Sequence, residues 1–196
     1  MNNGKFLDKP RCALGGRWVQ TTFFVAALNA LCWLAGCTTI PGGLQAVQGF
    51  QLQRYLGKWY EIARLDHSFE RDLDHVTAEY ALRDGGGVTV INRGFDAKKG
   101  EWRQAEGVAR FTEGADVGSL KVSFFGPFWG GYHIIALDQQ NYRYAMVSGP
   151  SRSFLWILSR DKTLDDKTLA DLIGQATKWG FDTKKLIFVK QDLPDN

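Results

Sequence analysis

The stretch HVTAEYALRD, residues 75–84, alternates apolar and polar side chains with a period of two. Ala78 and Tyr80 fall on one face of this pattern, as expected of a β-strand that buries one side. The stretch GGGVTVINRGF, residues 85–95, places three glycines before a second alternating run, which predicts a tight turn into a second strand. Together the two stretches predict an antiparallel hairpin with one buried face.

Similar segments recur along residues 57–160, separated by turn signals about every 8–12 residues. The others are GKWYEIARL, EWRQAEGVARF, GSLKVSFFG, GYHIIALD, YRYAMVSGP and FLWILSR. Eight antiparallel strands that follow one another by short turns close most simply into an up-and-down barrel, whose interior can hold one small ligand. A β-sandwich also fits the alternation.

One helix and a short ninth strand are predicted after the barrel. Apolar residues from Leu169 to Ala176 recur at helical spacing, Asp165 suits the first turn, and Gly180 suits the C-terminal cap. LIFVK, residues 186–190, reads as the final strand. The predicted fold class is therefore all-β with one helix, which packs outside the barrel.

The first 36 residues have the three parts of a secretory signal: a basic start, the apolar run FFVAALNALCWLA and the small residues Ala35 and Gly36. The apolar run of 13 residues is shorter than the roughly 20 that a transmembrane helix needs. We therefore expect residues 1–36 to be removed, residues 37–49 to form a tether and residues 50–196 to form the barrel domain.

Leu34-Ala35-Gly36-Cys37 matches the bacterial lipobox, in which the cysteine thiol receives diacylglycerol and the new amine is acylated with a fatty acid such as palmitate. Three acyl chains, at about 0.8 kcal/mol per buried methylene, would attach the protein to a membrane almost permanently. The alternative is a buried or reactive free cysteine. Thr38 follows Cys37, and the absence of Asp there fits the outer membrane, at its periplasmic face.

Composition narrows the function classes. The chain has 24 basic and 21 acidic residues, and removal of residues 1–36 would leave 20 of each. This balance does not favour nucleic acid as a partner. Cys12 and Cys32 precede the inferred cut, so the mature chain could form no internal disulfide.

Nothing in the sequence predicts a metal, a cofactor or a catalytic residue. His67, His75 and His133 show no metal-ligand spacing, and no G-x-S-x-G motif is present. We expect His67 and His75 at the surface, because they bracket a loop, and His133 on the outer face of its strand.

GKWY at residues 57–60 matches the G-x-W signature of the lipocalins. DQQNY at 138–142 resembles the second signature of that family, and Arg160 closes the eighth segment as the third signature requires. The runs YLGKWYEIARLDHSFER, VINRGF, VSFFGPF and GPSRSFLWILSR resemble the bacterial outer-membrane lipocalins, whose nearest animal relative is apolipoprotein D. The resemblance covers residues 50–191.

The resemblance implies a structural role for five signature residues, namely Gly57, Trp59, Asp138, Tyr142 and Arg160. Trp59 would fill the closed end of the barrel, with the Arg160 guanidinium over its ring at an energy on the order of 1 kcal/mol. Tyr144 is an alternative to Tyr142 in the second signature.

An inward Trp59 places Glu61, Ala63 and Leu65 on the same face by strand alternation. Glu61 is either a buried acid that pairs with a tyrosine or arginine, or a direct contact for a ligand headgroup. An unpaired buried carboxylate would be costly or would take up a proton.

The register of the family predicts an apolar, aromatic inner wall with Trp156 in the middle of the cavity and Leu158 below it. The other predicted wall residues are Ala78, Tyr80, Val90, Ala105, Ala109, Val122, Phe124, Tyr132, Ile134 and Phe154. Ordinary core packing is the alternative for each of them. As a set they favour a cavity for a long apolar tail, with the polar end of the ligand at the mouth.

Two aromatic loops are expected around that mouth: DHSFERDLDH at 66–75, with Phe69, and FFGPFWGG at 124–131, with Phe128 and Trp129. Exposed aromatic side chains there would suit a membrane surface, a partner subunit or the ligand. A loop folded over its own barrel rim is the alternative.

The sequence therefore predicts a lipid-anchored lipocalin that binds fatty acids or lysophospholipid-like amphiphiles for lipid storage, transport or envelope maintenance. One alternative is a lipid-modifying enzyme, an esterase or isomerase that uses Glu61 as a general acid. Another is a structural envelope lipoprotein with a filled barrel. The resemblance is compatible with a homodimer.

Overall fold

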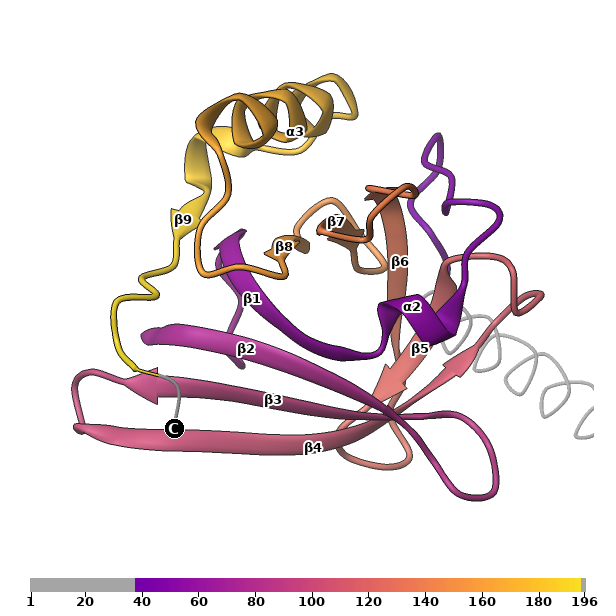
Figure 1. Cartoon of the computed structure of the whole chain (residues 1–196), viewed down its shortest axis with the longest axis horizontal. Coiled ribbons are helices and arrows are strands. Elements are labelled where there is room, and N and C mark those ends of the chain that lie inside the picture. The colour runs from indigo at the N-terminus through magenta and orange to yellow at the C-terminus, as the bar shows by residue number, and fades with distance from the viewer. Residues whose placement is uncertain (1–37, 195–196) are drawn as a thin grey trace, which may run out of the picture. The chain divides into compact units, whose positions relative to one another are not determined.

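The computed structural model describes residues 38–194, so Cys37 and the expected signal segment lie outside the described residues. The described chain forms an antiparallel barrel with one long helix outside it (Figure 1). The elements are α2 (Leu52–Tyr55), β1 (Gly57–Arg64), β2 (Leu73–Leu82), β3 (Val88–Asp96), β4 (Glu101–Phe111), β5 (Ser119–Ser123), β6 (Gly130–Leu137), β7 (Tyr144–Ser148), β8 (Leu155–Ser159), α3 (Asp166–Lys178), η1 (Thr183–Lys185) and β9 (Ile187–Phe188).

Strands β1 to β8 close on themselves. Consecutive strands pair antiparallel from β2 through β8, β8 pairs with β1, and β1 also pairs with β2. Trp59 of β1 stands opposite Ala78 of β2 in the closing pair. The predicted eight-stranded barrel is confirmed, and the sandwich is wrong, because β1 hydrogen-bonds to both of its neighbours.

Helix α3 covers the outer wall, as predicted. The Asp165 carboxylate accepts a hydrogen bond from the Thr168 backbone N–H at 2.9 Å, which satisfies one of the free donors of the first turn. Leu172 and Ala176 are buried in an outer core that also includes Ile157 of β8. β9 pairs with the end of β1, so the predicted final strand is also present.

A bulge in β1 changes the alternation that the sequence predicts. The pairing with β8 shifts register between Glu61 and Ala63, and one extra residue reverses the faces of the residues that follow. Ala63 and Leu65 consequently belong to the outer core beneath α3, and their predicted inward position is wrong. Arg64 takes the inward position, opposite Trp156.

The segment expected to be a tether lies against the barrel. The Val47 N–H donates to the Ile134 carbonyl at 2.9 Å, and the Val47 carbonyl accepts from the Gly118 N–H at 2.9 Å. Leu44 and Ala46 are buried. The described part of this segment therefore belongs to the folded domain.

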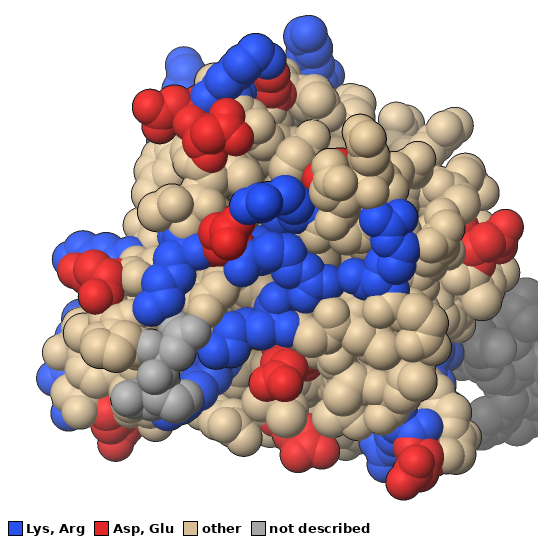
Figure 2. All heavy atoms as spheres, viewed as in Figure 1, with Lys and Arg blue, Asp and Glu red and all other residues tan. Residues whose placement is uncertain are grey.

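Charge is unevenly distributed over the surface. Figure 2 shows Lys and Arg side chains gathered in a diagonal band across the face that Figure 1 presents, while acidic side chains lie in small groups around it. The balance of 20 basic and 20 acidic residues expected after residue 36 thus conceals a locally basic face.

Candidate ligand-binding cavity

The inside of the barrel contains one main cavity, with an empty volume of about 830 Å³ when its open mouth is included. The wall is mostly aliphatic and aromatic. It is formed by Phe50, Leu52, Tyr55, Glu61, Phe69, Glu70, Val76, Ala78, Tyr80, Val88, Val90, Asn92, Ala109, Leu120, Val122, Phe124, Gly131, Tyr132, Trp156 and Leu158.

Ten of the thirteen residues predicted as ligand contacts lie on this wall. They are Glu61, Phe69, Ala78, Tyr80, Val90, Ala109, Val122, Phe124, Tyr132 and Trp156. They come from seven strands and two loops, and those on strands show that the strand parity expected from the sequence applies around the barrel. Leu158, also expected inside, lies on the wall below Trp156.

The other three predicted contacts lie elsewhere. Ala105 is exposed, because β5 pairs with β4 only from Val108 to Phe111 and leaves the first half of β4 as an edge. Ile134 is fully buried in the inner core and does not reach the cavity. Phe154 precedes the first residue of β8, and its ring packs at 6.1 Å from the His67 ring.

The floor of the barrel is sealed by Trp59, which is completely buried. The Arg160 guanidinium carbon lies 3.9 Å from the centroid of its indole ring. Arg160 also donates to the carbonyls of Lys58, Arg54 and Leu56 at 2.8–2.9 Å. One cation therefore joins β8, α2 and the start of β1 around a single indole.

The turn between β6 and β7 completes the closed end. The Asp138 carboxylate accepts hydrogen bonds from the backbone N–H groups of Gln140, Asn141 and Arg143. Tyr142 is buried, and its hydroxyl accepts a hydrogen bond from the Gln51 N–H at 2.9 Å. The geometry thus gives Tyr142, rather than Tyr144, the place in the inner core.

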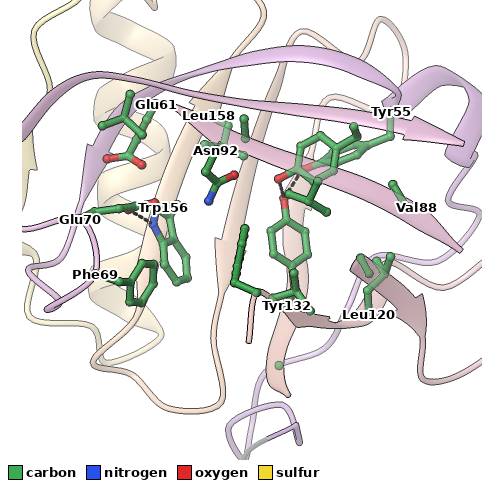
Figure 3. A pocket seen from close by; sticks show the side chains of 18 of the residues that line it. Tyr55, Glu61, Phe69, Glu70, Val88, Asn92, Leu120, Tyr132, Trp156 and Leu158 are labelled. Carbon is green, nitrogen blue, oxygen red and sulfur yellow. Dashed lines mark hydrogen bonds between the residues drawn. The ribbon is translucent and has the colours of Figure 1, made fainter. Parts of the chain in front are cut away.

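Three tyrosine hydroxyls meet at the inner end of the cavity (Figure 3). The Tyr132 hydroxyl lies 2.7 Å from those of both Tyr55 and Tyr80. Burial raises the pKa of all three hydroxyls, so they stay neutral and can exchange hydrogen bonds with a ligand. Tyr55 belongs to the single-turn helix α2, which strand parity does not reach.

Two acidic side chains form the opposite polar end of the cavity. Figure 3 shows Glu61 and Glu70 on one side, beside Trp156 and Phe69. The Arg64 Nη1 donates to Glu61 Oε1 at 2.7 Å, and the Trp156 Nε1 donates to Glu70 Oε2 at 3.0 Å. Glu61 therefore pairs with an arginine, as one of its two predicted roles requires, and it also lines the cavity.

The two carboxyl groups differ in protonation. Burial, followed by the charge of Glu70, raises the pKa of Glu61 well above its ordinary value. Burial also opposes ionisation of Glu70, but His67, whose Nε2 lies 3.1 Å from Glu70 Oε2, together with Trp156 and Arg64, lowers the pKa of Glu70 overall. The pair therefore holds a proton more readily on Glu61 than on Glu70.

Asn92 adds a polar group between the two ends of the cavity (Figure 3). Its Oδ1 atom is buried without a hydrogen-bond partner among the described residues. A buried acceptor in this state is stabilised by any donor that reaches it. Asn92 is thus a contact that the sequence did not indicate.

Replacement of the proton-bearing carboxyl should change how stability depends on pH. Because the folded-state pKa of Glu61 is raised, its contribution is complete below the ordinary value of about 4.3 and is lost as the pH rises through the folded value. Glu61→Gln should therefore gain stability relative to the wild type as the pH rises above that ordinary value, because glutamine binds no proton in either state. Urea unfolding at several pH values measures this difference.

Glu79→Gln is the matched control, because Glu79 is exposed on β2. Its stability should follow the wild type across the same range. Parallel curves for the wild type and Glu61→Gln would contradict the assignment of the proton to Glu61.

The histidines differ from expectation. His67, His75 and His133 are all buried, so the predicted surface position of His67 and His75 is wrong.

Within residues 38–194, no group of three metal-binding side chains comes together. In the same part of the chain, no helix is long and apolar enough to cross a membrane.

A closed barrel with a sealed floor, an apolar interior and an open aromatic mouth is the architecture of a small-molecule-binding β-barrel. The chain belongs to the lipocalin family, since the family model described as a lipocalin-like domain matches residues 50–191. The lipocalins are a family of binding proteins.

Individual relatives agree with this assignment. The outer membrane lipoprotein Blc of Vibrio cholerae is 53% identical over 158 residues, which cover 81% of this chain and 92% of that protein. The protein of the same name in Escherichia coli K12 is 52% identical over 169 residues, or 85% of this chain and 95% of that protein. Apolipoprotein D of Mus musculus is 30% identical over 161 residues, which cover 76% of this chain and 81% of that protein. The resemblance to bacterial outer-membrane lipocalins is thus confirmed.

Solved structures support the same fold. Insecticyanin from the tobacco hornworm Manduca sexta superposes with a TM-score of 0.62 at 25% identity, over 81% of this chain and 88% of that chain. The cockroach allergen Per a 4 superposes with a TM-score of 0.61 at 19% identity, over 79% of this chain and 95% of that chain.

Proposed function

We propose that this protein is a lipid-anchored lipocalin that holds a single-chain amphiphile, a fatty acid or a lysophospholipid-like lipid, inside its barrel. Lipid storage, transport or envelope maintenance is its role in this proposal. The observation that carries it is the cavity, which is apolar along its length and polar at two ends. In this proposal an acyl chain lies along Val88, Val90, Leu120 and Val122, and a headgroup lies beside Glu61 and Glu70.

The acidic end favours some headgroups over others. A bare carboxylate beside the ionised Glu70 would experience like-charge repulsion inside a medium of low dielectric constant. An ammonium or hydroxyl group can instead donate hydrogen bonds to the carboxyl oxygens. We therefore infer that a lysophospholipid-like headgroup suits the site better than a free fatty acid, which would enter most readily in its protonated form.

Attachment to the membrane completes the proposal. Leu34-Ala35-Gly36-Cys37 matches the lipobox, and the relatives from Vibrio cholerae and Escherichia coli bear the name outer membrane lipoprotein. Cys37 would carry the acyl chains, and the barrel would face the periplasm from the outer membrane.

Binding without catalysis is the simplest chemistry for this cavity. Glu61 is held by Arg64 at 2.7 Å, and Glu70 is held by Trp156 at 3.0 Å, so both carboxyl groups already have partners. The open cavity speaks against the alternative of a purely structural barrel with a filled interior.

Native mass spectrometry of the domain formed by residues 38–196 tests the proposal. We expect a copurified lipid of unchanged chemical structure, or stoichiometric uptake of added lipid. Lysophosphatidylethanolamine should quench tryptophan emission at lower concentration than palmitate at pH 7.5, because Trp156 lies on the cavity wall. The difference in affinity between the two lipids should become smaller at pH 5, because more of the palmitate is protonated there.

Recovery of a hydrolysed or isomerised lipid would show an enzyme instead. Absence of both a copurified lipid and any quenching would show that the barrel binds no amphiphile. Tighter binding of palmitate at pH 7.5 would contradict the role given to Glu70.

A further inference from the structure

The loop between β5 and β6, residues 124–129, carries the most exposed large apolar side chains of the described chain. Phe125 is 76% exposed and Phe128 is 74% exposed. The Phe128 N–H donates to the Phe125 carbonyl at 3.0 Å, so a tight turn holds the two rings at its tip. Phe69, in the neighbouring mouth loop, is 53% exposed. Aromatic rings presented in this way suit a boundary between apolar and aqueous surroundings.

Cationic side chains lie at the base of the same loop. The Lys121 Nζ atom lies 5.1 Å from the centroid of the Trp129 ring, and the Arg110 guanidinium carbon lies 5.5 Å from it. A tryptophan beside two cations, next to two exposed phenylalanines, resembles the side chains found at a membrane interface, where apolar rings enter the bilayer and cations remain beside the phosphates.

The start of the described chain lies next to this loop. The Thr38 carbonyl oxygen lies 3.2 Å from the position that a Cβ atom would occupy on Gly131, the second residue of β6. The same position lies 2.7 Å from the His133 Nε2 atom. Thr38 therefore lies at the mouth end of β6, beside the His133 ring.

This position limits where an acyl anchor can be. Cys37 precedes Thr38 directly, and adjacent Cα atoms are about 3.8 Å apart. A free tether of 12 residues would span up to roughly 40 Å and would allow any orientation of the barrel. The packed segment removes this freedom, because Leu44 and Phe50 are buried in the domain.

We propose that the β5–β6 loop is a membrane-contacting tip, and that the mouth of the barrel rests on the lipid bilayer that holds Cys37. The proposal rests on the lipidation of Cys37 given under the proposed function. The acyl chains hold the tip at a high effective concentration near the bilayer, so weak insertion of two rings is enough to orient the barrel. A lipid can then pass between the bilayer and the cavity without crossing open water.

Quenching by brominated lipids tests this orientation in the full-length, processed lipoprotein. The protein is reconstituted in vesicles of phosphatidylethanolamine and phosphatidylglycerol at 3:1, with or without brominated acyl chains. Trp129→Phe defines the part of the emission that comes from the tip. In the wild type, we expect brominated acyl chains to quench the Trp129 emission by at least half. The double variant Phe125→Ser/Phe128→Ser should reduce this quenching at least twofold.

Leu82→Ser is the matched control, because Leu82 is 57% exposed and ends β2 at the closed end of the barrel. Its quenching should equal that of the wild type. Equal quenching of the wild type and Trp129→Phe would show that the lipid does not reach Trp129, and it would overturn the proposal. Quenching of the double variant Phe125→Ser/Phe128→Ser to the wild-type extent would overturn it as well. Circular dichroism establishes that each variant is folded.

Two mass measurements distinguish a bilayer contact from a contact between protein copies and from loss of the anchor. A change in oligomeric mass of the double variant, without a change in quenching, would show that the tip contacts a second copy and would overturn the proposal. An intact mass without acyl groups would overturn the anchor on which both proposals depend, whereas an acylated protein whose Trp129 is not quenched would overturn the orientation alone.

Discussion

Trp59→Ala should lower the free energy of unfolding by about 3–5 kcal/mol, the usual cost when a large aromatic side chain is removed from a core. Trp59 is completely buried, and its Nε1 donates to the Tyr55 carbonyl at 2.8 Å. Its loss also leaves Arg160 without the ring that it covers at 3.9 Å. Because small domains are stable by only about 5–15 kcal/mol, urea unfolding should show a large shift of the midpoint.

Trp156→Ala is the comparison that separates floor from cavity. Trp156 is partly exposed and lies on the cavity wall, so its removal mainly enlarges a space that already exists. We expect a smaller loss of stability and a clear loss of lipid binding. Equal losses of stability in the two variants would contradict the division of the barrel into a sealed floor and an open cavity. Trp59→Phe, which keeps a ring under Arg160, should lie between wild type and Trp59→Ala.

The fold was largely predictable because its main signal is local. Alternation in residues 75–84 and the glycines at 85–87 specify a strand and a turn without reference to the rest of the chain, and both occur at β2 and β3. The bulge after Glu61 was not predictable in this way, because it is a mismatch between β1 and β8, two segments far apart in the sequence.

The sequence predicted which side chains face the inside of the barrel, but not how far along the barrel axis each of them lies. Alternation gives the face on which a side chain lies, and this placed Val90 and Val122 on the wall. It does not give the height along the barrel axis, so Ala105 was predicted inside although it lies on the exposed edge of β4, outside its pairing with β5. Ile134 has inward parity as well, but it lies within the inner core.

Contacts outside the strands were missed for a related reason. Glu70 lies in the loop after β1, and Tyr55 lies in α2, so neither has a strand parity from which a position follows. The spacing of His67 and Glu70, three residues apart in DHSFERDLDH, is the one local signal that could have indicated a paired acid there. The described structure adds its contact with Trp156 at 3.0 Å.

Val122→Trp should reduce the affinity for a long-chain lipid while the barrel remains folded. Val122 lies on the cavity wall opposite Ala109, and an indole at this position would occupy the volume that an acyl chain needs. Forcing extra atoms into a filled interior costs about 1–3 kcal/mol, which corresponds to roughly a 5- to 150-fold increase in Kd. Tryptophan quenching or native mass spectrometry with lysophosphatidylethanolamine measures the change.

Val108→Trp is the matched control, since it makes the same substitution on the adjacent strand β4, at the residue before Ala109. Alternation turns Val108 to the outer face when Ala109 lies on the cavity wall, so lipid affinity should stay within about twofold of the wild type, a difference near 0.4 kcal/mol. If both variants bind lipid like the wild type, the ligand does not occupy the middle of the barrel. If both lose binding equally, the loss reflects a general disturbance of β4 and β5, and the cavity is not identified as the site.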